Sequence, residues 1–434
     1  YDRIRGDLTI DAITNPPNVL QPTLFFGRLN DIPNLRGGGV RAIPSVIGVD
    51  PGGELPTVYT YSLSVQRNVG WSTVVDVAYV GSQARHLARQ RNLNAVPYLT
   101  AFRREAQDPT RFAGGVVPAV EPNLPAAYSA AGFSFSGANA LPVDFLRPFP
   151  GYGDILYRSF DANSNYNGLQ VGVTRRFKDN FTFGVAYTFS KTLTTSSDDN
   201  EITHPTDSRG YDYRLAGFDR THVLVVNYVY NLPKASRRLG DNWLARGLLD
   251  NWQLSGISQF VSGTPFELSL TGLGGLGARL VGAPTVNAGN LSGQQPRFRL
   301  VGDPRMSGGT DGLQINPGAF AIPAIGDTGP YPRNYLRNPG WNNHDLSVFK
   351  NFPFGGEGAR YLQLRFEFFN ILNHTQFTSF NGGAVTATPG STTPVFNVRG
   401  SAACAATTTL GSCFGEFNAA RDPRIVQLAA KLYF

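Results

Sequence analysis

The sequence predicts an all-β chain in which about ten antiparallel strands form part of a transmembrane β-barrel. Three observations predict this class: the composition, a period-two alternation of apolar and polar residues, and a succession of short turns and long loops. The 434 residues include 49 Gly and 30 Pro, with 12% aromatic and 16% charged residues. Such a composition is rich in strand and turn formers and poor in helix formers.

The first two strands are predicted where apolar and small polar residues alternate. Residues 57–68 read TVYTYSLSVQRN and residues 72–82 read STVVDVAYVGS, with VGW between them. Successive side chains of a strand point to opposite faces, so Tyr61 and Leu63 share one face while the serines beside them share the other. Two such runs joined by a short turn indicate an antiparallel hairpin.

Seven further strands are predicted by the same alternation, and RIRGDLTI, residues 3–10, is a tenth candidate. The seven are residues 169–177, 181–189, 222–230, 252–260, 345–352, 362–369 and 425–434. The last run, IVQLAAKLYF, has an apolar face made of Val426, Leu428, Ala430, Leu432 and Phe434. By itself this run also fits an edge strand of a soluble sandwich, whereas the regular polar faces of the other runs favour strands between lipid and water.

Charged and amide side chains on one strand indicate what the polar faces contact. Gln363, Arg365 and Glu367 alternate with large apolar residues in the run LQLRFEFF. A charged pair on the inner face of a strand is stable only if that face is wet. These three residues are therefore predicted to face a water-filled lumen.

Five long connections separate the predicted hairpins. They comprise residues 11–56, 83–165, 192–219, 264–343 and 374–423. Loops longer than about 15 residues are uncommon in compact soluble domains, whereas outer-membrane barrels combine short periplasmic turns with long extracellular loops. If the last strand runs toward the periplasm, every short turn lies on that side. Residues 1–434 are therefore predicted to form one integral outer-membrane domain with extracellular loops.

Composition also excludes several classes of protein. Mean hydropathy is -0.18, and no stretch approaches the roughly 20 apolar residues of a membrane-spanning helix. The net charge is +7, but the basic residues are scattered, so no nucleic-acid partner is expected. The chain starts without a signal peptide or Met and inside an apparent strand, and we expect it to be a piece of a longer protein.

Cys404 and Cys413 are the two cysteines of the chain. An isolated close pair fits a small disulfide-closed loop in an oxidising compartment, and a metal site would need more ligands.

Candidate catalytic and metal-binding motifs are weak. The five histidines lie far apart, and neither G-x-S-x-G nor H-E-x-x-H occurs, so no enzyme activity or cofactor is expected. GLGGLG, residues 272–277, matches a dinucleotide-binding pattern without the following helix and acidic residue, and is interpreted as an outer loop. Asp198, Asp199 and Glu201 offer oxygen ligands for Ca²⁺, but their spacing matches no known calcium loop, which favours a solvated acidic loop.

Several longer runs resemble one family. YNGLQVGVTRRFKDNFTFGVAYTFSK, GFDRTHVLVVNYVYNLP, HDLSVFKNF, LRFEFFNILNHTQF and FGEFNAARDPRIVQLAAKLYF are similar to the C-terminal half of the Oar-like TonB-dependent outer-membrane receptors of Acidobacteria and related soil bacteria. The resemblance extends from Pro56 to Phe434. It implies a 22-stranded barrel, filled by an N-terminal plug and preceded by an energy-coupling segment, of which this chain contains about ten strands.

The resemblance also implies function and partners. It implies gated uptake, or export, of a large or scarce substrate, driven by a TonB-type energy-coupling protein that acts through the missing N-terminal half and plug. Outer-membrane lipid and lipopolysaccharide would surround the barrel. Val426, Leu428, Ala430, Leu432 and Phe434 resemble the terminal signal read by the barrel-assembly machinery, with Ala430 the weakest match. A surface barrel that acts as an adhesin, binding or assembly subunit is the alternative, and a hydrolase is disfavoured by the missing Ser and His grouping.

Overall fold

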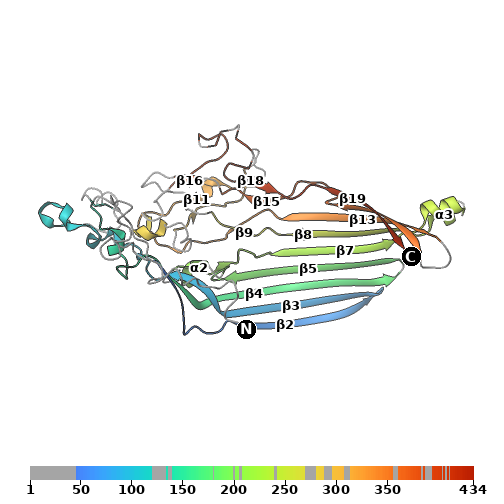
Figure 1. The fold of residues 1–434 in the computed structure, drawn as a ribbon, viewed down its shortest axis with the longest axis horizontal. Helices are drawn as coiled ribbons and strands as arrows, with labels where there is room; N and C mark the ends of the chain where they lie inside the picture. The colour runs from blue at the N-terminus through green and yellow to red at the C-terminus, as the bar shows by residue number, and fades with distance from the viewer. Residues whose placement is uncertain are drawn as a thin grey trace, which may run out of the picture.

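One large antiparallel sheet dominates the computed structural model (Figure 1). The structure describes residues 45–119, 133–134, 139–178, 180–198, 201–204, 208–238, 242–268, 280–287, 296–306, 313–354, 360–382, 385–386, 393–402, 404–405, 408–409 and 411–434. The long strands lie side by side in the order β19-β14-β13-β8-β7-β5-β4-β3-β2. Each long strand therefore pairs with the long strands before and after it in sequence.

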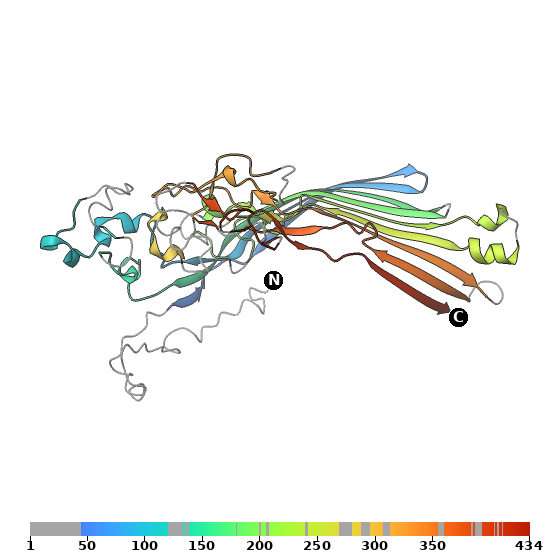
Figure 2. The same cartoon turned by 90° about the horizontal axis from the view of Figure 1, so that it is seen from above.

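The nine long strands are those predicted from the alternation of residues. They are β2 Thr57–Gly70, β3 Thr73–Asn92, β4 Ile155–Lys178, β5 Phe181–Thr194, β7 His222–Asn231, β8 Trp252–Val261, β13 Trp341–Pro353, β14 Tyr361–Phe369 and β19 Ile425–Tyr433. The tenth candidate, residues 3–10, lies outside the described residues. Seen from above, the edge strands β2 and β19 diverge toward the end with the short turns, so the sheet is an open arc (Figure 2).

The register gives the sheet one apolar and one polar face. Leu63 lies opposite Tyr79, which lies opposite Leu169, which in turn lies opposite Phe189. One residue further along each strand, the facing side chains are polar or small, as with Ser64, Ala78 and Gln170. Because side chains alternate between faces, this register carries the apolar row across four strands without interruption.

The strands β3 and β4 extend further than the alternation predicts, into residues 83–92 and 155–165 of the predicted long loop. The two strands contain 20 and 24 residues, and their ladder continues to the pair Asn92 and Leu156. Polar contacts hold this extension together: Arg89 donates to Asp161 at 2.6 Å and to Thr203 at 2.7 Å. The pattern failed here because a strand end covered by polar loops does not need an apolar face.

Short elements lie in the long connections, at the end of the sheet opposite the short turns. The strands are β1 Val46–Val49, β6 Arg214–Leu215, β9 Pro265–Phe266, β10 Arg299–Leu300, β11 Phe320–Ala321, β12 Leu336–Arg337, β15 Phe377–Phe380, β16 Val385–Thr386, β17 Val395–Phe396 and β18 Phe417–Ala420. β1 pairs in parallel with β4, and β6 pairs with β5. The other eight form four two-stranded sheets. The loops therefore have regular structure that the sequence pattern did not reveal.

The loops also have a buried apolar core of their own. It consists of Leu268, Leu280, Phe298, Ile315, Ala319, Phe320, Ile322, Leu336, Phe396 and Phe414. These residues come from the connections after β8 and β14. Burial of about ten apolar side chains, at roughly 1.5–3 kcal/mol for each large one, stabilises a compact layer at this end of the sheet.

Helices are short throughout the described part of the chain. They are η3 Thr100–Phe102, η4 Arg104–Ala106, η5 Pro109–Arg111, η6 Ala113–Gly115, η7 Val143–Phe145, α2 Ser208–Asp212, η8 Ala235–Arg238, α3 Trp243–Leu249, η9 Pro284–Asn287 and η11 Pro317–Ala319. None among the described residues is long and apolar enough to cross a membrane. η8 and α3 project beyond the end of the sheet that carries the short turns (Figure 2).

Candidate functional site

The polar face of β14 takes part in a chain of hydrogen bonds across three strands. Gln363 donates to the Asn351 side chain at 2.9 Å and accepts from Arg365 at 2.6 Å. Arg365 also donates to the Tyr433 hydroxyl at 2.9 Å. Glu367 lies on the same face between Ser347 and Gln427. The arrangement satisfies Gln363, which is buried, and holds a guanidinium on the polar wall.

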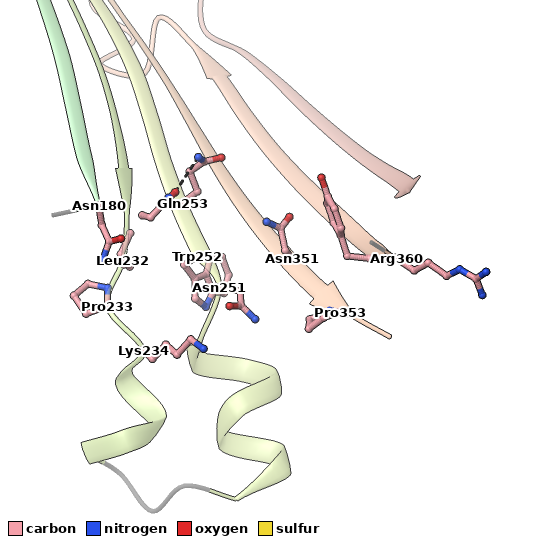
Figure 3. A pocket seen from close by; sticks show the side chains of 12 residues that line it. Asn180, Leu232, Pro233, Lys234, Asn251, Trp252, Gln253, Asn351, Pro353 and Arg360 are labelled. Atoms are coloured by element: carbon pink, nitrogen blue, oxygen red, sulfur yellow. Dashed lines mark hydrogen bonds between the residues drawn. The ribbon is translucent and has the colours of Figure 1, made fainter. Parts of the chain in front are cut away.

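A hollow of about 420 Å³ lies at the short-turn end of this wall, next to the hydrogen-bond chain (Figure 3). Its lining includes Asn180, Asn231, Leu232, Pro233, Lys234, Asn251, Trp252, Gln253, Asn351, Pro353, Arg360 and Tyr361. Within it, Gln253 donates to Asn231 at 2.9 Å. Amide side chains donate and accept, so this lining can hydrogen-bond a polar peptide or water equally well.

A second polar cluster lies at the base of the loops and unites the connection between β5 and β7 with the connection between β8 and β13. We call Glu201, Asp212, Arg214, Glu267, Arg297 and Arg333 the loop ion network. Asp212 accepts from Arg297 at 3.0 Å and lies 3.3 Å from Arg333. Arg333 also contacts Glu267 at 2.8 Å and Glu201 at 3.4 Å, and Arg214 pairs with Glu201.

Burial dominates the electrostatics of the loop ion network. Burial raises the pKa of Asp212 above its usual value, although the His204 backbone N–H and Arg297 act against the shift. Burial, together with repulsion from Arg333, lowers the pKa of Arg297 to about 10. Burial lowers the pKa of Arg214 as well. For Arg333 the attraction of Glu267 and Glu201 outweighs burial, so its pKa is raised.

The loop ion network balances its own charges. Three guanidinium groups face three carboxylates, and the His204 backbone N–H adds a 2.6 Å hydrogen bond to Asp212. The His204 ring stacks on Tyr211 at 4.0 Å, and Tyr98 meets it edge-on. Because the partners are internal, this cluster joins loops to one another rather than presenting charge to a ligand.

Two of the three calcium candidates are described, and neither forms a metal cage. Glu201 accepts from the Ser197 backbone N–H at 2.8 Å and pairs with Arg214 and Arg333. Asp198 is exposed, and Asp199 lies outside the described residues. No group of three metal-ligating side chains lies together in the part of the chain that the structure describes.

The disulfide between Cys404 and Cys413 is present, with Cα atoms 5.9 Å apart. Glu416 forms several hydrogen bonds that hold the disulfide-closed loop. This carboxylate accepts from Arg399 Nη2 at 2.8 Å and from the backbone N–H of Gly411 at 2.9 Å. The hydrogen bond from Arg399 lowers the pKa of Glu416 and raises that of Arg399. The prediction of a disulfide-closed loop is confirmed.

Comparison with known proteins shows which face of the sheet meets lipid and which end of the sheet is periplasmic. The sequence matches the family described as an outer membrane beta barrel domain over residues 2–427. The chain belongs to this family. It is an integral protein of the outer membrane, so the apolar face of the sheet meets lipid and the polar face lines the lumen. The short turns mark the periplasmic end and the long connections the extracellular end.

No curated protein sequence matches the chain. Among solved structures, the outer membrane transporter YddB from Escherichia coli has a TM-score of 0.40 and 7% identity. The match covers 92% of this chain and 35% of the YddB chain. The ferric citrate transporter FecA, unliganded, has a TM-score of 0.33 and 10% identity, with coverage of 87% and 31%. The siderophore receptor PiuA from Acinetobacter baumannii has a TM-score of 0.29 and 8% identity, and the match covers 87% of this chain and 34% of PiuA. The chain spans about a third of the length of these proteins.

The terminal strand of this outer membrane barrel domain presents its apolar set to lipid. Val426, Leu428 and Leu432 are exposed, and Phe434 is 95% exposed. Leu432 pairs with Leu362 and Ala430 with Leu364. The aromatic rings of Tyr361 and Tyr433 stack on the lumenal side at 4.4 Å. The strand thus has the two-faced form that membrane insertion requires; its recognition by an assembly machinery stays a prediction.

Sequence reasoning missed the loop ion network and the helical hairpin between β7 and β8. The network joins Asp212 to Arg297 and Arg333, which lie 85 and 121 residues away, and no local spacing reveals such pairs. A signal did exist for the hairpin. NWLARGLL carries an N-cap Asn and apolar residues three to five apart, which is a short amphipathic helix pattern.

Proposed function

We propose that this chain is a segment of a TonB-dependent outer-membrane transporter of the Oar-like type, contributing the C-terminal part of a larger barrel. The observation that carries the proposal is the open arc. Nine long strands leave β2 and β19 each with one neighbour among the described residues, and lipid tolerates no open sheet edge. Further strands are needed for closure, and barrel diameter grows with strand number, so the completed lumen is wide.

The proposal includes a plug and a source of energy, as the resemblance to the Oar-like receptors implies. In this proposal an N-terminal plug fills the lumen and touches the polar wall that carries Gln363, Arg365 and Glu367. A TonB-type energy-coupling protein acts on the plug from the periplasm. Uptake and export are both compatible with this arrangement. Lipid and lipopolysaccharide surround the wall, and the barrel-assembly machinery reads the terminal strand.

The test is photo-crosslinking in the intact protein. A benzoylphenylalanine at Asn351, on the lumenal wall beside the hollow, should crosslink to a segment upstream of Tyr1 in the same polypeptide. The matched control is the same label at Leu428, on the lipid face, which should give no such product. A static, large conductance of the purified protein in planar bilayers, with no crosslink from Asn351, would overturn the proposal.

A surface barrel that binds a partner is the second candidate, and the loop layer favours it. The layer has its own apolar core, a disulfide and the loop ion network, which together make a rigid extracellular platform. Binding of cells or matrix that persists after deletion of the TonB-type gene would favour this candidate over transport. Neither candidate is an enzyme, and we propose no catalytic residue or cofactor.

A further inference from the structure

The periplasmic turn between β7 and β8 carries an exposed apolar surface. We call residues 234–238 and 242–250, with η8 and α3, the periplasmic hairpin. Trp243 is 79% exposed and Leu248 63%, and Leu244 is exposed as well. Large apolar side chains gathered on one short helix in this way mark a surface that meets another phase or partner.

The exposed apolar residues share one side of α3. At about 100° per residue, Trp243, Leu244, Gly247 and Leu248 fall within an arc of roughly 140°. Arg246 lies outside this arc, and Lys234 is exposed at the base of the hairpin. The exposed apolar residues of the helix therefore lie on one side, and its single charged residue, Arg246, lies beside them.

The hairpin is fixed to the lipid-facing side of the sheet. Trp252 shares the apolar face with Leu254, and its indole N–H donates to the Leu248 carbonyl of α3 at 2.8 Å. Lys350, opposite Trp252 on the same face, donates to the Asp250 carbonyl. Its ammonium group lies 5.3 Å from the Trp252 ring centre. The end of α3 is thus anchored on the side of the wall that meets lipid.

A buried contact closes the hairpin at its base. The Asp250 carboxylate accepts from the Ser236 backbone N–H at 3.0 Å and from the Ser236 hydroxyl at 2.7 Å, and both residues are buried. At the start of α3, Asn242 accepts from the Ala245 backbone N–H at 2.7 Å. These contacts hold η8 and α3 in place and leave the apolar side of α3 outward.

Other exposed aromatic residues lie at the same end of the sheet. Trp71 occupies the turn between β2 and β3, Phe354 follows β13, and Phe434 ends the chain. Aromatic side chains gather at membrane interfaces because one part of the ring system is apolar while the other tolerates water. The apolar side of α3 therefore continues an interfacial girdle.

We propose that the periplasmic hairpin lies in the headgroup region of the inner leaflet of the outer membrane, with Trp243, Leu244 and Leu248 inserted among phospholipid chains. Arg246 lies at the level of the lipid phosphates, which it complements in charge. The hairpin then anchors the periplasmic edge of the barrel wall. This role depends on the outer-membrane assignment and is independent of transport.

Spin labelling of the intact protein in phosphatidylethanolamine and phosphatidylglycerol vesicles tests the proposal. Leu244→Cys carries the label on the apolar side and Arg246→Cys is the matched control on the same helix; the disulfide-bonded cysteines do not react. The label at Leu244 should show a several-fold higher ratio of oxygen to nickel-chelate accessibility than the label at Arg246. Equal, water-like ratios at both positions would overturn the proposal and would favour a periplasmic protein as the partner of this surface.

A second variant separates lipid contact from folding. The triple change Trp243→Gln, Leu244→Gln and Leu248→Gln removes the apolar side without touching Trp252, Lys350 or Asp250. We expect unchanged heat-modifiable migration of the barrel, and loss of the low-water signature at a label placed on Gly247→Cys. Retention of that signature in the triple variant would contradict insertion of these side chains.

Discussion

Arg333 pairs with two carboxylates from another connection and one from its own, and its removal should loosen the extracellular layer. Its side chain is buried and contacts Glu267, Asp212 and Glu201. Arg333→Ala leaves these carboxylates with fewer partners, and breaking a buried ion pair costs about 3–5 kcal/mol. We expect faster proteolysis of the outer loops on whole cells, with normal heat-modifiable migration of the barrel.

Arg305 supplies the matched control for that experiment. It pairs with Asp303 at 3.6 Å, but its side chain is 86% exposed, and exposed pairs contribute little to stability. Arg305→Ala should therefore leave the proteolysis rate unchanged. Equal rates for the two variants would show that the loop ion network does not stabilise the layer.

Glu416 should make the disulfide loop sensitive to acid. The hydrogen bond from Arg399 holds the pKa of Glu416 below its usual value of 4.5. A depressed carboxyl pKa in the folded state adds stability that is fully present above the ordinary value and is lost as pH falls through the folded value. Protection of the Gly411 and Cys413 amides from hydrogen exchange, corrected for the intrinsic rate, should therefore fall below pH 4.5.

The variant Glu416→Gln tests that cause. It removes the charge and keeps a side-chain oxygen as acceptor, so protection should be low at both pH 6 and pH 4. The same pH-dependent loss of protection in the variant as in the natural protein would contradict the assignment to Glu416.

At the scale of the element, β19 combines sheet pairing with an apolar terminus. Deletion of Phe434 removes the aromatic ring at the periplasmic end of the lipid face, so we expect less folded barrel in outer membranes and more degradation. Phe434→Tyr keeps the ring, tolerates the interface and should assemble normally. Heat-modifiable protein in membrane fractions measures both; normal assembly of the deletion variant would contradict the predicted assembly signal.

The strands were predictable because each contacts lipid on one face. Leu63, Val171 and Phe366 each belong to an apolar set that occupies every second position of its strand, because that face contacts hydrocarbon. This local pattern can be recognised without knowledge of the fold. The extended ends of β3 and β4 obey no such rule, because loops cover them and polar residues such as Arg89 find partners there. Asp212 and Arg333 come together only in the tertiary structure, so their ion pair cannot be predicted from spacing in the sequence.

The polar wall was predictable in part. Gln363 and Arg365 were expected to face water, and they share a hydrogen-bond chain with Asn351 and Tyr433. Their partners depend on the register between β13, β14 and β19, which a single strand does not specify. The periplasmic hairpin was not predicted, because its helix has 7 residues and the signal in NWLARGLL therefore extends over about two turns only.

For the whole molecule, the decisive property is the open arc of the sheet. β2 contains 14 residues and pairs on one side only within the described part of the chain. In a lipid phase each backbone group left unpaired costs several kcal/mol. Residues 1–434 expressed alone behind a signal peptide should therefore yield no detergent-resistant, heat-modifiable species. Co-expression with the upstream strands that the proposed larger barrel requires should restore it, because these strands would pair with β2 and β19. A compact, resistant monomer formed by these residues alone would show that the sheet closes on itself and would refute the proposed larger barrel.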